Sequence, residues 1–262
     1  MVADLRRRHD ALAQAKDILV VGGGMAGVEV AGFLAEHFRD ATVTLVHGGE
    51  HLLSNQPRVA PKFIADVTTK LQGQGVVIAL NERLDLPPAE QLHEPARRTI
   101  RSTTSDREFA SDVQILTVGS AGLNTDFVRS DHAWRDAVTA EGAVRVNEFL
   151  QVVGQPHVFA CGDIIDVSDL NLAHPAFRTE LNARVEAMTA ADNIKRLRNG
   201  TSLKAWGAMH LMATAAVGRA TGTVQGLPFD QWSVSGWLGN LLTRIKSGDF
   251  YASAYTPEFA PL

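Results

Sequence analysis

The 262-residue sequence predicts an α/β fold in which a parallel β-sheet is covered by helices. Short apolar runs such as Ile18–Val21 suit parallel strands that are buried on both faces. Helical patterns alternate with these runs, and over 58–72 the apolar residues recur at every fourth position. A glycine-rich turn at Gly22–Gly27 joins the first strand to the first of these helices. Alternating strands and helices of this kind indicate a layered α/β architecture.

The first half of the chain contains most of the expected sheet. A polar helix over 5–16 precedes the first strand. We then expect a helix over 25–38, a strand over 42–47, a helix over 58–72, a strand over 76–80, an antiparallel pair at 99–103 and 108–113, and a strand over 114–118. A strand–helix start, an antiparallel insert and a return strand are typical of an α/β sandwich.

The composition changes after Gly119. Short strands are expected at 144–146 and 158–160, followed by a long helix over 173–198. The last part contains strand-like segments at 208–217 and 221–224, and an apolar helix near 234–246. These shifts predict three parts with boundaries at 1–118, 119–198 and 199–262.

Charge and composition exclude several classes of function. The net charge of −4 offers no positive field, so nucleic acid is not an expected partner. The single cysteine, Cys161, precludes an internal disulfide, and the nine histidines lack metal-ligand spacing, so no metal is expected. The N-terminus has no apolar run after its basic residues, and no stretch has the length of a membrane span. We therefore expect a cytoplasmic protein whose membrane contact, if any, is peripheral.

The glycine-rich turn carries the strongest signal for a ligand. Gly22, Gly24 and Gly27 fit the pattern G-x-G-x-x-G between a strand and a helix. The first glycine permits a tight turn, the second lets the backbone approach a pyrophosphate, and the third lets helix and strand pack closely. The free N–H groups of the helix N-terminus attract the phosphates. The expected contact residues are Gly22, Gly23, Gly24, Met25, Ala26 and Gly27. The turn predicts a dinucleotide-binding Rossmann unit; the alternative is a glycine-rich turn with no ligand.

The end of the second strand bears on the choice between NAD and NADP. An Asp or Glu there would accept hydrogen bonds from the adenosine ribose and repel a 2′-phosphate. This sequence has His47 at that place, with Glu50 shortly after it, and Arg58 or Lys62 nearby to hold a phosphate. We therefore expect both cofactors to be tolerated. That His47 is only a polar strand end remains an equal alternative.

Two further motifs resemble the flavoproteins that bind two dinucleotides. Glu29 follows the third glycine by two residues, and the resemblance places it near the nicotinamide–flavin junction. The stretch VFACGDIID resembles the late flavin motif of these proteins. The resemblance implies that Gly162 lets the backbone approach the flavin and that Asp163 accepts hydrogen bonds from the ribityl or phosphate-linking region of the flavin. The segment Leu116–Gly119 resembles the strand that returns to the flavin domain, which makes Gly119 a cofactor-site candidate. A surface glutamate and a common Gly-Asp turn are the alternatives for these motifs.

More specifically, the chain resembles the apoptosis-inducing-factor-like quinone oxidoreductases of the ferroptosis-suppressor type. The segments that carry this resemblance are ILVVGGGMAGVEVA, VTLVH, RVNEFLQV, FACGDIIDV and TRIKSGDFYAS. It implies a Rossmann-like three-layer FAD/NAD(P)-binding fold and hydride transfer from NAD(P)H through FAD to a quinone-like acceptor. It also places Lys246 near the flavin, against the alternative of a solvated helix-end lysine. Because Cys161 has no CxxC partner, the disulfide-reductase branch is not expected.

The sequence departs from this family in one respect. Such enzymes carry an earlier G-x-G-x-x-G for the ADP part of FAD, whereas this sequence contains one such motif. We therefore expect an N-terminally truncated fold that binds FAD poorly by itself. Two alternatives to an oxidoreductase stay open: a non-catalytic NAD(P)-binding module, and a subunit that completes another flavoprotein chain.

An apolar stripe near the C-terminus has two interpretations. On a helix over 234–246 the apolar residues would fall along one face, with cations near its end. These residues are Val234, Trp237, Leu238, Leu241, Leu242 and Ile245, with Arg244 and Lys246 as the cations. The stripe predicts an acceptor-side or peripheral membrane-facing helix, or else a helix that packs on the protein's own core.

Overall fold

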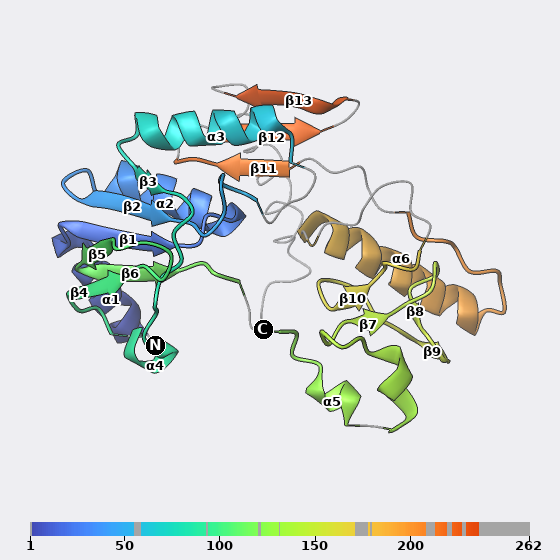
Figure 1. Cartoon of the computed structure of the whole chain (residues 1–262). Coiled ribbons are helices and arrows are strands. Elements are labelled where there is room, and N and C mark those ends of the chain that lie inside the picture. Colours follow the sequence, from blue (N-terminus) through green and yellow to red (C-terminus); the bar gives the residue numbers. More distant parts are fainter. Residues whose placement is uncertain are drawn as a thin grey trace. The chain divides into compact units, whose positions relative to one another are not determined.

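The computed structural model describes most of the chain and divides it into two compact units. The described residues are 2–54, 59–92, 94–119, 122–130, 132–170, 178, 180–207, 213–218, 222–226 and 229–235. The first unit comprises Met1–Gly119 with Met212–Leu262, and the second comprises Ser120–Leu211 (Figure 1).

A four-stranded parallel sheet forms the centre of the first unit. Its strands are β1 (Asp17–Val21), β2 (Thr42–Val46), β3 (Val77–Ala79) and β6 (Val113–Leu116), in the order β3-β2-β1-β6. Val21 pairs with Val46 on one side and with Leu116 on the other. The carboxyl ends of three strands therefore lie at one edge of the sheet, directly beside the glycine-rich turn. Ligands of open parallel sheets bind at this edge.

Alternation along the strands creates two faces and hence three layers. Ile18 and Val20 are buried against α2 (Met25–His37) and α3 (Pro61–Gly73). Leu19 and Val21 are buried on the opposite face, against the antiparallel pair β4 (Arg98–Arg101) and β5 (Glu108–Ser111). Figure 1 shows helices on one side of this sheet and the β4–β5 pair on the other. The expected α/β fold with three layers is confirmed, as is the antiparallel insert.

Several helix boundaries differ from those expected. The helix expected over 58–72 begins at Pro61, because Ala60 has extended backbone and proline is favoured in a first helical turn. The polar N-terminal helix α1 spans Val2–Gln14, and a short helix α4 (Ala89–Leu92) lies in the polar stretch before β4. Arg58 lies outside the described residues.

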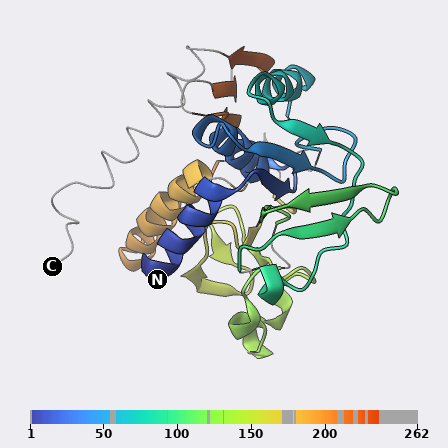
Figure 2. The ribbon, with the colours of Figure 1, turned by 90° about the vertical axis from the view of Figure 1, so that its left-hand side faces the viewer.

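The C-terminal strands belong to the first unit. They are β11 (Ala213–Ala216), β12 (Gly222–Gly226) and β13 (Phe229–Ser235), and they form an antiparallel sheet. β11 contacts α2, and β12 and β13 contact α3, as both views show (Figures 1 and 2). The helix expected near 234–246 is wrong at its start, because Val234 pairs with Val224 as a strand residue. Trp237, Leu238, Leu241, Leu242, Arg244, Ile245 and Lys246 lie outside the described residues.

The second unit combines short strands with one long helix. Its helical elements are α5 (Asp126–Arg129), a 3₁₀ turn at His132–Ala137 and α6 (Glu180–Arg198). Its strands are β7 (Val144–Arg145), β8 (Gln151–Val152), β9 (Gln155–Phe159) and β10 (Ile165–Asp166), with β7 parallel to β10 and β8 antiparallel to β9. Val146, Leu150, Ile165, Ala190 and Trp206 form a buried core. The helix expected over 173–198 is described from Glu180 onward.

The two compact units differ from the three parts predicted from the sequence. Residues 199–207 group with the second unit, whereas the described strands after 212 group with the first. The sequence pattern assigns residues 199–207 and the later strands to one C-terminal part, 199–262. That this part is a separate domain remains a prediction. Among the described helices, none is long and apolar enough to cross a bilayer.

Candidate nucleotide-binding site

The glycine-rich turn brings the end of β1 and the start of α2 into close contact. Gly22 has a left-handed φ of +110°, and a Cβ built there would lie 2.5 Å from the carbonyl oxygen of Thr117. A Cβ at Gly27 would collide with the carbonyl oxygen of Gly22, so the helix packs against the turn only if this residue is glycine. Both observations match the roles expected for the first and third glycines.

The same turn presents a set of unpaired amides. The N–H of Gly22 donates to Val46 O, and the first helical bond runs from Val28 N to Gly24 O. Within the described part of the chain, the amides of Gly24, Met25, Ala26 and Gly27 donate no hydrogen bond. Gly24 at the N-cap has no side chain to satisfy them. Free amides at the N-terminus of a 13-residue helix form a site for phosphate groups. The residues present therefore fit the pyrophosphate of a dinucleotide.

His47 is fixed to this turn by both ring nitrogens. Its Nδ1 accepts the N–H of Gly23 at 3.1 Å, and its Nε2 is 2.8 Å from Ser54 Oγ. Because an amide is only a donor, Nδ1 is unprotonated, so in the neutral ring Nε2 carries the proton and donates to Ser54. Burial lowers the pKa of His47, and the positive charges of His51 and Arg83 act in the same direction. His47 is therefore a neutral residue that holds the glycine turn.

Glu29 lies in the second turn of α2, and its contact differs from the expected one. Its Oε1 accepts the backbone N–H of Ala216 in β11 at 3.0 Å. In this structure the carboxylate thus fastens the C-terminal sheet to α2. Its expected place near a nicotinamide–flavin junction stays a prediction.

The Gly-Asp motif of the second unit forms a turn after β9. Gly162 has a φ of +84°, and its N–H donates to Glu186 Oε2 at 2.7 Å. Burial raises the pKa of Glu186; the amide of Gly162 opposes this effect and the charge of Asp163 adds to it. Asp163 is exposed. The left-handed turn needs glycine at position 162, and the exposed carboxylate of Asp163 follows it. This arrangement fits the acceptor expected for hydrogen bonds from the ribityl or phosphate-linking region of the flavin.

The other candidates are less informative. Gly119 is exposed, with a φ of +86°, just beyond β6. Cys161 is partly buried, and burial raises the pKa of its thiol, with a further contribution from Glu186. Lys246 lies outside the described residues. Lys62 forms an exposed ion pair with Asp66 at 2.8 Å rather than a free phosphate ligand. In the described ranges no three His, Cys, Asp or Glu side chains come together to hold a metal ion.

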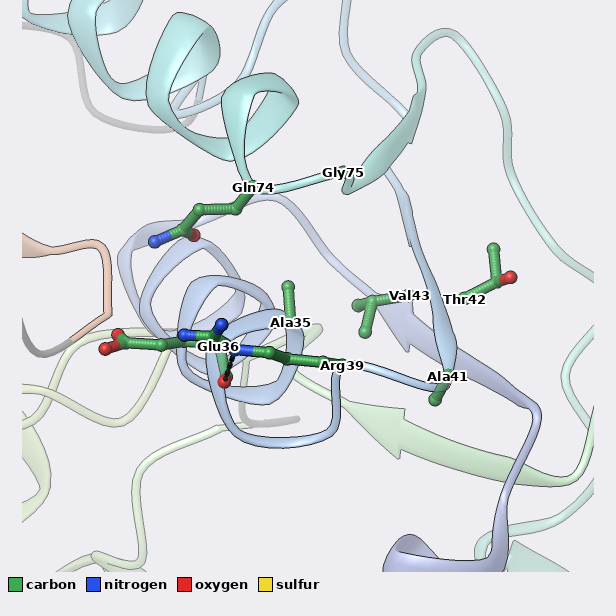
Figure 3. A pocket seen from close by; sticks show the side chains of 8 residues that line it. All are labelled: Ala35, Glu36, Arg39, Ala41, Thr42, Val43, Gln74 and Gly75. Atoms are coloured by element: carbon green, nitrogen blue, oxygen red, sulfur yellow. Dashed lines mark hydrogen bonds between the residues drawn. The ribbon is translucent and has the colours of Figure 1, made fainter.

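A pocket of about 530 Å³ lies at the other end of the sheet from the glycine turn. Its lining residues come from the ends of α2 and α3 and the start of β2 (Figure 3). They are Ala35, Glu36, Arg39, Ala41, Thr42, Val43, Gln74 and Gly75. None of the expected site residues lines it. Ligands of open parallel sheets bind at the carboxyl ends of the strands, so we do not assign the dinucleotide to this pocket.

Four residues of these sites escaped the sequence analysis. Thr117 Oγ1 donates to the carbonyl oxygens of Val21 and Gly22, and so ties β6 to the glycine turn. Ser54 and Arg83 come from separate loops: Ser54 Oγ lies 2.8 Å from His47 Nε2, and Arg83 lies beside Gly48. Glu186 reaches the Gly-Asp turn from α6. Only Thr117, inside the segment Leu116–Gly119, gave a local signal; the others depend on contacts distant in sequence.

Comparison with known proteins places the chain among redox enzymes. A family model described as pyridine nucleotide-disulphide oxidoreductase matches residues 2–191. Human ferroptosis suppressor protein 1 is 30% identical over 238 residues, which cover 90% of this chain and 58% of the human protein. Apoptosis-inducing factor homolog B of Dictyostelium discoideum is 26% identical, with 94% and 64% of the two chains covered. The chain thus spans about 58–64% of the length of these curated relatives.

Solved structures agree with the fold. NDH2 of Plasmodium falciparum, determined in complex with NADH, has a TM-score of 0.68 at 14% identity and covers 92% of this chain and 63% of its own. The water-forming NADH oxidase of Lactobacillus brevis, bound to NADH, has a TM-score of 0.63 at 19% identity and covers 85% and 44%. At such identities the similarity establishes the Rossmann-type fold.

Proposed function

Because the chain belongs to the pyridine nucleotide-disulphide oxidoreductase family, we propose that its protein passes a hydride from NAD(P)H through FAD to a quinone-like acceptor. NAD(P)H and FAD are the cofactors of this family. The observation that carries the proposal is the set of free amides at Gly24–Gly27, held beside the carboxyl edge of the parallel sheet. The ferroptosis suppressor proteins among the relatives support a quinone as the acceptor class.

The chain's own residues have defined tasks in this proposal. The amides of Gly24–Gly27 bind the pyrophosphate, while His47 and Thr117 hold the glycine turn in the binding conformation. Asp163 accepts hydrogen bonds from the ribityl or phosphate-linking region of the flavin. Glu186 holds the Gly-Asp turn by accepting the N–H of Gly162. The cofactors supply the hydride chemistry, and the protein binds and orients them.

A second candidate is a nucleotide-binding subunit that completes another flavoprotein chain. The free amides at Gly24–Gly27 belong to the one G-x-G-x-x-G motif of this sequence and suit a single dinucleotide, which favours this candidate. In that case this chain binds NAD(P)H, and a partner chain with its own G-x-G-x-x-G motif binds the ADP part of FAD.

Purified protein distinguishes the two candidates. The chain is supplied with FAD and NADPH or NADH, and reduction of a short-chain ubiquinone is followed by absorbance. Turnover that Gly24→Val abolishes supports the oxidoreductase. Nucleotide binding without flavin binding or turnover, restored by a co-purifying flavoprotein chain, supports the subunit. Absence of nucleotide binding would overturn both.

We also propose a cytoplasmic location with peripheral membrane contact through the part of 234–246 that follows β13, which ends at Ser235. The support is the apolar spacing in the sequence and the cations at its end. Trp237→Glu combined with Leu241→Glu tests the contact in a liposome sedimentation assay. Lost sedimentation with an unchanged melting curve supports a membrane face, whereas a collapsed melting curve shows that the residues pack in the protein core.

A further inference from the structure

We propose that Arg83 makes this site selective for NADPH over NADH by binding the phosphate on the 2′-oxygen of the adenosine ribose. The assignment rests on the proposed binding of a nicotinamide nucleotide at the glycine turn. In Rossmann units this ribose lies at the end of the second strand, where an acidic side chain excludes the phosphate.

His47 occupies the strand end, and it neither repels nor pairs with a phosphate. Both ring nitrogens are engaged, one by the amide of Gly23 and the other by Ser54 Oγ. The ring therefore carries no negative charge against the phosphate and has no free donor for it. Any selectivity must come from a neighbouring side chain.

The loop after β3 brings Arg83 to this strand end and holds it there. Asn81 N donates to Gly49 O and Glu82 N donates to His47 O, both at 3.0 Å, so the loop is bonded to the end of β2. The carboxylate of Glu82 is buried and accepts hydrogen bonds from Ser102 Oγ, Ser105 Oγ and Arg107. These contacts fix the loop and leave the Glu82 charge matched by Arg107.

The backbone of Arg83 is held on both sides. Its N–H donates to Thr104 Oγ1 at 3.1 Å, and its carbonyl oxygen accepts the N–H of Thr103 at 2.6 Å. The guanidinium group lies against the turn that follows β2. A Cβ built at Gly48 would be 3.1 Å from Arg83 Cγ, 3.5 Å from Nε and 3.6 Å from Cζ. Glycine at position 48 therefore lets the side chain lie over the turn where the ribose is expected.

The guanidinium group has unused hydrogen-bonding capacity. Arg83 is exposed, and among the residues that the structure describes its side chain makes no hydrogen bond or ion pair. Neighbouring arginines differ, since Arg101 pairs with Glu108 and Arg107 with Glu82. Glu50 is exposed at the same turn and forms no ion pair with Arg83 in the described contacts. An exposed guanidinium group without a partner among the described residues suits a phosphate dianion, which it binds through two parallel hydrogen bonds.

Equilibrium titration of the full 262-residue chain with NADPH and with NADH tests the assignment, with intrinsic tryptophan fluorescence or calorimetry as the readout. Arg83→Ala should weaken NADPH binding roughly ten- to a hundredfold, the usual range for a lost charged hydrogen bond, and leave NADH binding unchanged. Arg83→Lys should retain part of the NADPH preference, because the charge remains while the two-pronged geometry is lost. Arg101→Ala is the matched control, since it removes one exposed, paired cation.

The outcomes separate this assignment from the proposed function. An unchanged ratio of NADPH to NADH affinity in Arg83→Ala, with both nucleotides still bound, overturns the role of Arg83 alone. An equal loss in Arg101→Ala also overturns it, since general charge would then explain the effect. Wild-type protein that binds neither nucleotide overturns the proposed function and the assignment with it.

Discussion

His47 makes the stability of the first unit depend on pH, because its hydrogen bonds to Gly23 and Ser54 require the neutral ring. The neutral ring is bonded to Gly23 and Ser54, and burial lowers its pKa below the ordinary value of 6.5. The unfolded chain therefore binds a proton at a higher pH than the folded chain. The stability that this contact provides is fully present above about pH 6.5 and is lost as the pH falls below it.

Melting curves across this pH range test the role of His47. In His47→Asn the side-chain oxygen can accept the Gly23 amide but does not titrate. The wild-type melting temperature should fall more steeply below about pH 6.5 than that of the variant. Parallel curves for the two proteins would contradict a half-buried, neutral His47.

Substitutions at Gly24 and Gly27 should have different effects, the first on nucleotide binding and the second on folding. Gly24 has φ −73° and ψ −175°, a backbone conformation that any residue adopts, so Gly24→Val should fold. The added side chain would block the pyrophosphate, and nucleotide binding should be lost. Gly27→Val should unfold the unit, because its Cβ would collide with the Gly22 carbonyl oxygen. Circular dichroism and nucleotide titration check both; a Gly24→Val protein that binds nucleotide normally would refute the site.

Cys161 should react slowly despite its place beside the Gly-Asp turn. Burial and the neighbouring Glu186 raise the pKa of its thiol, and the thiolate is the reactive form. At neutral pH its alkylation by iodoacetamide should therefore be slower than that of free cysteine. Measured by mass spectrometry over time, a rate equal to that of the free amino acid would show that the thiol is not shielded.

Between elements, the carboxylate of Glu29 joins α2 to β11. Glu29→Ala leaves the Ala216 amide without this acceptor and should destabilise the first unit by about 1–3 kcal/mol. Glu29→Gln retains a side-chain oxygen and should lie close to wild type in urea unfolding. Equal midpoints for the Ala and Gln variants would mean that the hydrogen bond does not fasten the C-terminal sheet.

The elements that local pattern determines were predictable from the sequence. The strand at Ile18–Val21, the turn at Gly22–Gly27 and the following helix each follow from apolar periodicity and glycine spacing, and all are present. The apolar spacing that begins at Val59 predicts the start of α3 three residues early, whereas Pro61 marks the observed start because proline is favoured in a first helical turn. Val234 has the same apolar character in a helix or a strand, and its pairing with Val224 decides for the strand.

The surroundings of His47 depend on contacts between residues that are distant in the sequence. The sequence indicates His47 because this residue ends a predicted strand beside the glycine-rich motif. Its hydrogen-bond partner Ser54 and the nearby Arg83 have no such signal, because a turn positions Ser54 and the loop after β3 positions Arg83. The bond between Asn81 and Gly49 that brings Arg83 near is a tertiary contact without a sequence period. Lys62, an expected phosphate ligand, has a partner one helical turn away in Asp66.

For the whole molecule, the candidate cofactor residues are divided between the two units. The glycine turn, His47 and Arg83 lie in the first unit, and the Gly162–Asp163 turn lies in the second. Local stabilisation by a bound nucleotide should therefore be confined to the first unit. This expectation separates nucleotide binding at the glycine turn from binding at the Gly-Asp turn.

Hydrogen exchange with and without saturating NADPH, read by mass spectrometry, tests most directly whether the nucleotide binds at the glycine turn. Peptides that cover Gly22–Glu29 and His47–Ser54 should become protected, since their amides and loops surround the ligand. Peptides over 144–166 should be unchanged. Protection confined to 144–166, or no protection at saturating NADPH, would contradict the assignment of the nucleotide to the glycine turn.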